Sequence, residues 1–125
     1  MNEDLEIDIV EMFRYSNISQ EFSATDIIFK QGAYADKMYV IVDGDVDIEV
    51  EGRIVATLTP GNIVGEMALV ENLPRSATAI AKTHCRLVPI DRDNFIYIVK
   101  EHPQFALFII KDLSNKIREL NLKVS

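Results

Sequence analysis

Short apolar segments separated by glycine turns fill the middle of this 125-residue chain, and no other feature limits its fold as strongly. Residues 45–52 read DVDIEVEG, in which apolar and acidic side chains alternate with a period of two. Such alternation is typical of a strand with one buried and one solvated face. Further strands are expected at 27–29, 38–42, 54–58, 77–81 and 85–90. With turns about every eight to twelve residues, the pattern favours an all-β roll, sandwich or barrel.

The periodicity is helical at both ends of the chain. Apolar residues recur at helical spacing over 3–14, which predicts a short amphipathic helix there. These residues are Leu5, Ile9, Val10 and Phe13. Residues 91–93, which read DRD, offer an N-cap for a helix over 95–99, and His102-Pro103 starts a long helix that runs to the end. The expected organisation is one domain, mainly β, with a helical segment over 1–17, an antiparallel β-roll (jelly roll) over 18–90 and helices over 91–125.

Charge is distributed unevenly along the chain. Residues 1–51 contain 13 acidic and 3 basic residues and residues 52–125 contain 7 and 10, which gives net charges of −10 and +3. This excludes a broad basic surface, so we expect no contact with nucleic acid, and we expect any anion site in the second part. The longest apolar run, 105–110, is too short to span a membrane. A lone cysteine, Cys85, permits no internal disulfide, and the N-terminus lacks a signal-peptide pattern, so a cytoplasmic location is expected.

Metal-binding and catalytic sites find little support in the residue pattern. The acidic run that starts at Asp43 resembles the start of a calcium-binding EF-hand loop, but Ile48 and Ile54 occupy the places of its glycine and glutamate. A solvated strand face explains these acids better. His84 and His102 belong to different predicted elements, without the carboxylates that a metal-dependent barrel enzyme requires. No nucleophile–base arrangement stands out, so neither catalysis nor a metal or other cofactor is expected.

One segment does have the features of a ligand site. Residues 65–79 read GEMALVENLPRSATA, with Glu66 and Arg75 among small residues that leave backbone amides open to a close ligand. Gly65 permits a tight turn, and the next four residues suffice for one helical turn whose free amides face an anion. An arginine binds two phosphate oxygens with its forked guanidinium, whereas a carboxylate beside a phosphate suits a neighbouring hydroxyl such as a ribose 2′-OH. The plain alternative is a surface salt bridge between Glu66 and Arg75.

This segment closely resembles the phosphate-binding cassette of cyclic nucleotide-binding domains, which occur in the catabolite activator protein, protein kinase A regulatory subunits and cyclic nucleotide-gated channels. The family pattern is Gly-Glu-apolar-Ala-Leu, a short loop, and Pro-Arg-(Ala/Ser)-Ala-Thr, and every place in it is filled here. The segment FKQGAYADKMYVIVDGDVDI is similar to the family's entry strands, with Gly32 and Gly44 at its turns. The resemblance extends from about Ile18 to the last helix.

The resemblance implies a β-roll that binds cAMP or cGMP, and it implies roles for individual residues. Glu66 accepts a hydrogen bond from the ribose 2′-OH, and Arg75 pairs with the exocyclic oxygens of the cyclic phosphate. The remaining residues implied to contact ribose and phosphate, partly through backbone amides, are Gly65, Met67, Ala68, Ser76 and Ala77. The residues implied to flank or cover the base are Ile48, Val55, Lys116, Leu120 and Asn121. A hydroxyl residue after the arginine occurs in members of either preference, so the choice between cAMP and cGMP stays open.

The last helix carries apolar residues at alternating spacings of four and three. They are Ala106, Ile110, Leu113, Ile117, Leu120 and Val124. With Ile110, Ile117 and Val124 at heptad position a and leucine at d, the repeat favours a parallel two-stranded coiled coil, and hence a homodimer. Packing of a single amphipathic helix on the roll explains the same stripe equally well.

Two functional hypotheses follow. The first is a cyclic nucleotide-binding regulatory module that is not an enzyme and passes ligand binding to an unknown downstream protein by movement of its last helix. The second is a β-roll interaction or dimerisation module that does not respond to nucleotide. Titration with cAMP and cGMP separates the two.

Overall fold

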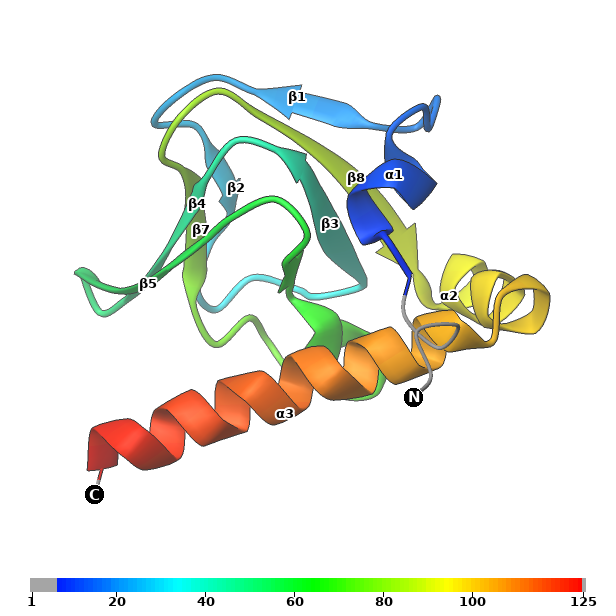
Figure 1. Ribbon diagram of the computed structural model, residues 1–125. Coiled ribbons are helices and arrows are strands. Elements are labelled where there is room, and N and C mark those ends of the chain that lie inside the picture. The colour runs from blue at the N-terminus through cyan, green and yellow to red at the C-terminus, as the bar shows by residue number, and fades with distance from the viewer. Residues whose placement is uncertain (1–6, 125) are drawn as a thin grey trace.

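The computed structural model describes residues 7–124, and their side chains as far as Asn121. The elements in chain order are α1 (Ile9–Phe13), β1 (Gln20–Phe22), β2 (Ile27–Phe29), β3 (Lys37–Asp43), β4 (Val46–Val50), β5 (Arg53–Leu58), β6 (Ile63–Val64), the 3₁₀ helix η2 (Glu66–Leu69), β7 (Thr78–Ala81), β8 (Cys85–Asp91), α2 (Arg92–Glu101) and α3 (Gln104–Val124). In Figure 1 the strands form a roll, with α1 and α2 at one end and α3 running along its lower side. The antiparallel β-roll with flanking helices that the sequence predicted is confirmed.

The strands form two four-stranded antiparallel sheets that pack face to face. Their strand orders are β1-β8-β3-β6 and β2-β7-β4-β5. The side chains buried between the sheets are Tyr39, Ile41, Val46, Val64, Ala79, Ala81, Cys85 and Leu87. The alternate residues of β3, Met38, Val40 and Val42, pack instead against the helices. Because β3 is covered on both faces, its sequence is an unbroken apolar run rather than an alternating one.

Strand β4 confirms the alternating pattern only in part. Val46 is fully buried, whereas Ile48 and Val50 are half-buried. Because β4 pairs with both β5 and β7, its acidic residues lie on a strand rather than in a metal-binding loop. On that strand the Asp47 carboxylate accepts a hydrogen bond of 2.6 Å from the Thr57 hydroxyl of β5. Among the described residues, no group of three or more His, Cys, Asp or Glu side chains is placed to hold a metal ion.

Helices α1 and α2 both begin at aspartate caps. The carboxylates of Asp8 and Asp91 accept hydrogen bonds of 3.1 and 2.8 Å from the backbone amide three residues later. Asp91 is the first of the three residues, 91–93, at which the sequence predicted a cap, and it starts α2 earlier than the predicted range of 95–99. The cap at Asp8 sets the start of α1 at Ile9, later than the predicted start at residue 3. Leu5, which was counted in that prediction, lies outside the described residues.

The first half of α3 packs on the roll. Phe105 is fully buried and Ile109 is 8% exposed. The ring of Phe105 contacts the rings of Phe13 and Phe95, with centroids 5.9 and 5.8 Å apart. Leu113, one turn further along, is half-buried against the same apolar cluster. This part of the helix therefore follows the single-helix interpretation of the apolar stripe.

Three other apolar residues of α3 are largely exposed. Ile110 is 61% exposed, and Ile117 and Leu120 are each 60% exposed. Of the described members of the predicted coiled-coil set, Ala106 and Leu113 are half-buried, and the side chain of Val124 lies outside the described ones. None of the described helices, α3 included, combines the length and the apolar character needed to cross a membrane.

Gly44, between β3 and β4, is expected to tolerate no side chain. Its φ is +87°, and a Cβ atom there would overlap the backbone oxygen of His84 and lie 2.8 Å from the Cα atom of Cys85. Gly52 has a similar φ of +83° but open space around it. Gly52→Ala is expected to cost about 1 kcal/mol of unfolding free energy, and Gly44→Ala about 1–3 kcal/mol more because the neighbouring strand must move. Urea unfolding measures both, and equal losses would contradict this expectation.

Candidate functional site

Arg75 is a buried cation without a carboxylate partner among the described residues. It is 7% exposed, and its Nη2 atom donates a hydrogen bond of 2.7 Å to the backbone oxygen of Lys37. The guanidinium lies on the ring of Phe29, with Cζ 3.9 Å from the ring centroid. The buried Nε atom has no hydrogen-bond partner among the described residues. Burial lowers the pKa of Arg75, but an arginine stays charged near neutral pH, so this site favours an anion.

Gly65 lets the cassette turn close against this arginine. Its φ is +78°, and a Cβ atom at this position would overlap Nη1 of Arg75. The Nη1 atom lies 3.5 Å from the Gly65 carbonyl oxygen, at the outer limit of a hydrogen bond. Glycine alone combines this backbone conformation with so close an approach. The first residue of the cassette and its arginine are therefore neighbours in space.

The backbone amides of the cassette are only partly available to a ligand. The amide of Ala68 donates a hydrogen bond of 3.1 Å to the Gly65 carbonyl oxygen and so closes η2. The amides of Ser76 and Ala77 donate to no partner in the described part of the chain. Two free amides directly after a buried arginine are hydrogen-bond donors that suit an anion.

Glu66 is the first residue of η2, and its carboxylate pairs with α3. Its Oε1 atom accepts a hydrogen bond of 2.6 Å from Nζ of Lys116, and its side chain is 10% exposed. The same Nζ atom lies 3.0 Å from the carboxylate of Asp112 and donates a hydrogen bond of 2.9 Å to the backbone oxygen of Ile63. The alternative prediction of a surface salt bridge between Glu66 and Arg75 is therefore wrong, because both groups are largely buried and Glu66 pairs with a third residue.

Burial and the neighbouring charges shift the pKa values of Lys116 and Asp112. Burial lowers the pKa of Lys116, but the charges of Glu66 and Asp112 and their hydrogen bonds outweigh burial, so this pKa is raised. Burial raises the pKa of Asp112, and Lys116 limits that rise. Since the folded state holds the lysine proton more firmly than the unfolded chain, this contribution to stability is complete below pH 10.5, the ordinary value. It is lost as the pH rises through the higher pKa of the folded state.

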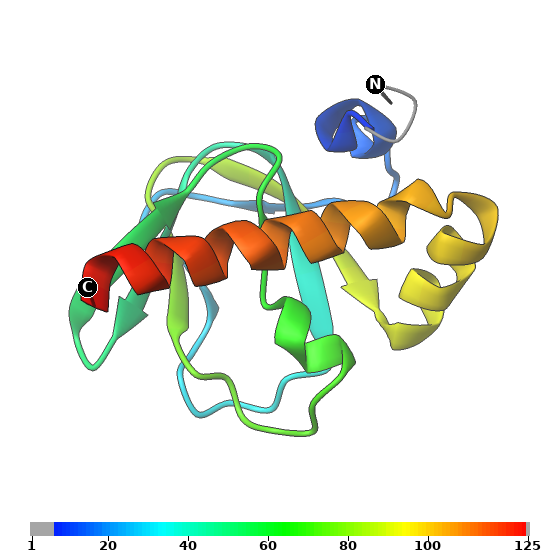
Figure 2. The ribbon, with the colours of Figure 1, turned by 60° about the horizontal axis from the view of Figure 1, so that its bottom comes forward.

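A cavity of about 610 Å³ lies between η2, the strands β4 and β5, and α3. This volume falls within the usual range for small-molecule sites. Figure 2 shows α3 crossing in front of the roll, with η2 beside it. Eleven of the twelve residues of the predicted ligand set line the cavity, namely Ile48, Val55, Gly65, Glu66, Met67, Ala68, Arg75, Ser76, Ala77, Lys116 and Leu120. Asn121 is not among the lining residues, and the contacts of all twelve with a ligand stay predictions.

Three contributors to the site were missed by the sequence analysis. Phe29 supports the guanidinium from β2, and Lys37 contributes only its backbone oxygen. A contact made by a backbone atom cannot be recognised from the pattern of side chains in the sequence. Asp112 lies four residues before Lys116 on α3, and this spacing of opposite charges is a signal that the sequence does contain.

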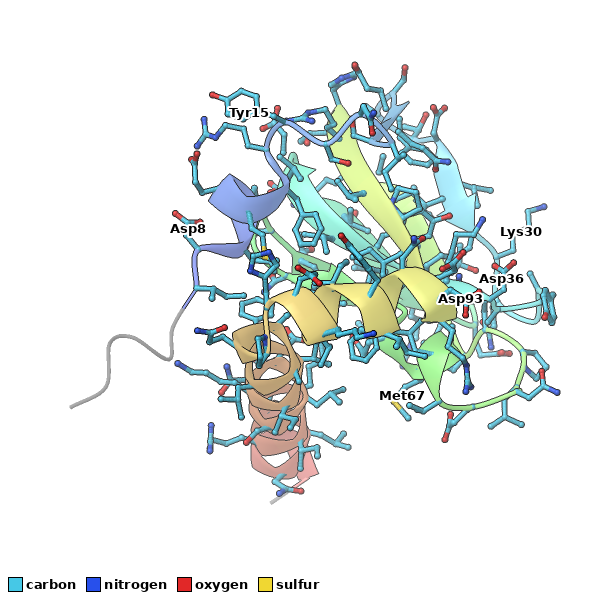
Figure 3. The ribbon with its side chains drawn as sticks, turned by 90° about the vertical axis from the view of Figure 1, so that its right-hand side faces the viewer. Asp8, Tyr15, Lys30, Asp36, Met67 and Asp93 are labelled. Atoms are coloured by element: carbon cyan, nitrogen blue, oxygen red, sulfur yellow. The ribbon has the colours of Figure 1, made fainter. Side chains whose placement is uncertain are left out.

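A second cavity, of about 340 Å³, lies next to the cassette and is strongly acidic. Its acidic lining residues are Asp36, Glu71, Asp91 and Asp93, against one basic residue, Arg92. Figure 3 shows Asp36 and Asp93 close together. Such a concentration of negative charge repels an anion, so a phosphate is not expected there.

Comparison with known proteins points to one family. The family model described as cyclic nucleotide-binding domain matches residues 19–102. A cAMP-dependent protein kinase regulatory subunit of Eremothecium gossypii is 43% identical over 68 residues, which are 54% of this chain and 15% of that protein. The cGMP-dependent protein kinase, isozyme 2 forms, of Drosophila melanogaster is 36% identical over 75 residues, which are 60% of this chain and 7% of that protein. The chain thus spans a small part of these curated relatives.

The solved structures agree with this result. The crystal structure of Thermus thermophilus catabolite activator protein matches with a TM-score of 0.79 and 25% identity, over 98% of this chain and 60% of that one. The match includes the roll and its flanking helices, and the family model includes the whole cassette from Gly65 to Ala79. This chain belongs to the cyclic nucleotide-binding domain family.

Proposed function

We propose that this chain binds a 3′,5′-cyclic nucleotide, cAMP or cGMP, in the 610 Å³ cavity, and that the whole chain acts as one domain. The observation that carries the proposal is Arg75, a buried guanidinium with an unpartnered Nε atom beside two free amides. A cyclic phosphate supplies the anion that this arrangement lacks. One relative is named as a cAMP-dependent and another as a cGMP-dependent kinase protein, which supports both candidate ligands.

In this proposal the phosphate, the ribose and the base of the nucleotide each contact a different group of residues. The phosphate binds Arg75 and the two amides that follow it. The ribose 2′-OH donates to Oε2 of Glu66, since Lys116 occupies Oε1. The base lies between apolar strand residues such as Ile48 and the side chain of Leu120 on α3. Because α3 borders the cavity, a ligand that contacts it more favourably in one position shifts the helix toward that position.

We propose a sensor without catalytic activity of its own, whose downstream protein is unknown. Binding of a cyclic phosphate requires neither a nucleophile nor a general base. The alternative is a β-roll module that interacts with proteins and does not respond to nucleotide. The exposed apolar residues of α3 favour that alternative, since an unpartnered apolar stripe marks an interaction surface.

Isothermal titration tests the proposal directly. Wild-type protein is titrated with cAMP, with cGMP and with linear 5′-AMP as a control that has the base and ribose but not the cyclic phosphate. Saturable binding of a cyclic nucleotide, much tighter than that of 5′-AMP, is expected, and the tighter of the two identifies the preferred base. Absence of binding by both cyclic nucleotides would favour the interaction module.

We further propose that two copies pair through the exposed stripe of α3. Ile110 and Ile117 occupy heptad position a, and both are exposed on the single chain. Sedimentation velocity at increasing protein concentration is expected to show a dimer for the wild type. Ile110→Lys combined with Ile117→Lys is expected to give a monomer, because two lysines in each helix repel their counterparts at the seam. A monomeric wild type at every concentration would contradict this pairing.

A further inference from the structure

A carboxylate beside a phosphate site creates an electrostatic problem. Near the cassette, Arg75 and Lys116 carry one positive charge each, and Glu66 and Asp112 carry one negative charge each, so the four sum to zero. The side chains of Glu66 and Asp112 are only 10% and 9% exposed, and water screens them little. Without Lys116 the remaining three groups would sum to −1 and repel an anionic ligand.

The ammonium group of Lys116 contacts two carboxylates and one backbone oxygen. Its Nζ atom meets three acceptors, at 2.6 Å on Glu66, 3.0 Å on Asp112 and 2.9 Å on the backbone oxygen of Ile63. The contacts with Glu66 and the Ile63 oxygen are hydrogen bonds, and the contact with Asp112 is an ion pair. All three contacts of Lys116 are thus with acceptors of the protein itself, whereas the family resemblance implies that Lys116 covers the base.

We propose that Lys116 is a positioning residue that neutralises Glu66 and thereby lets an anionic ligand bind next to a carboxylate. This inference rests on the proposed function. Asp112, one turn earlier on α3, and the Ile63 oxygen hold the ammonium in place, and Oε2 of Glu66 stays available to a hydroxyl. The other acids that line the cavity, Glu71 and Glu119, are exposed, so water screens their charges.

The test uses cAMP and 2′-deoxy-cAMP, which lacks the hydroxyl assigned to Glu66. Affinities are measured by isothermal titration at pH 7 for the wild type, Lys116→Met, Glu66→Gln and the double variant. Lys116→Met is expected to weaken binding of 2′-deoxy-cAMP roughly tenfold, the effect of a unit charge about 10 Å away at an effective dielectric constant of about 20. The double variant is expected to return to within about threefold of the wild type, because its site is neutral again.

A matched control and a second variant keep the test decisive. Lys100→Met removes the same charge from an exposed position on α2 and is expected to leave both affinities unchanged. If Lys116→Met does not fold, Glu66→Gln alone decides, since Asp112 and Ile63 still hold Lys116 in that variant. It is expected to bind 2′-deoxy-cAMP at least as tightly as the wild type, because the site gains one positive charge.

The possible results separate this inference from the proposed function. A loss of affinity in Lys116→Met that persists in the double variant would mean that Lys116 acts only by holding α3, and the inference would be overturned. Weaker binding of 2′-deoxy-cAMP by Glu66→Gln would overturn it as well. In both cases binding of cAMP by the wild type leaves the proposed function intact. If the wild type binds neither nucleotide, the proposed function fails, and this inference fails with it.

Discussion

Replacement of Arg75 by leucine is expected to remove the thermal stabilisation that a cyclic nucleotide gives the wild type. Ligand at 100 times its dissociation constant adds about 2.7 kcal/mol to the free energy of unfolding. For a 125-residue chain this raises the unfolding temperature by roughly 10 °C. Leucine loses the two charge-assisted hydrogen bonds to the phosphate, worth about 1.5–3 kcal/mol each, so the rise is expected to fall below about 2 °C at the same ligand concentration.

Scanning fluorimetry with and without cAMP or cGMP measures this effect. Arg75→Lys keeps the charge but not the forked geometry, so it is expected to retain part of the rise. Arg92→Leu removes an exposed arginine that does not line the 610 Å³ cavity, and it is expected to retain all of it. Each rise is taken relative to the same variant without ligand, since Arg75→Leu also deprives the Lys37 oxygen of its donor. A full rise in Arg75→Leu would place the ligand elsewhere.

Replacement of Phe105 by alanine is expected to lower the free energy of unfolding by about 3–5 kcal/mol. The ring is fully buried and is contacted by the rings of Phe13 from α1 and Phe95 from α2. Its removal leaves a cavity at the place where three helices meet a sheet. Because the neighbours belong to separate elements, they cannot all move inward together, and most of the cavity persists.

Urea denaturation of the ligand-free protein provides the measurement. Leu107→Ala, two residues further along α3, is the matched control because Leu107 is 48% exposed. It is expected to cost less than about 1 kcal/mol. Comparable losses in the two variants would mean that the first turn of α3 is not anchored by the aromatic cluster.

The strands that could be predicted from the sequence are those long enough to show a pattern. β3 appears as an unbroken apolar run and β4 as an alternating one, and both patterns span at least five residues. β1 and β6, with three and two residues, could not be predicted, whereas β2, also of three residues, could be because all three are apolar and precede a turn. β1 and β6 exist because neighbouring strands supply their hydrogen-bond partners, which is a tertiary effect.

The candidate site, like the fold, could be predicted from the sequence only in part. The cassette could be predicted because its residues are contiguous in sequence and their chemistry is local. The support for Arg75 could not, since Phe29 and the Lys37 oxygen come from other segments and one of them takes part through its backbone. Nor does the spacing along α3 say how far each apolar residue lies from the roll, so Leu113 and Ile117 looked equivalent until packing distinguished them.

By itself the sequence determined the family, the order of the helices and of the strands other than β1 and β6, and the presence of an arginine and a glutamate within one cassette. These properties depend on residue type and on separation along the chain. Only the tertiary structure decided that Glu66 pairs with Lys116 while Arg75 is left facing a cavity without an anionic partner among the described residues. The reason is physical, since electrostatic attraction depends on distance in space, and the folding of α3 over η2 brings Lys116 to the glutamate.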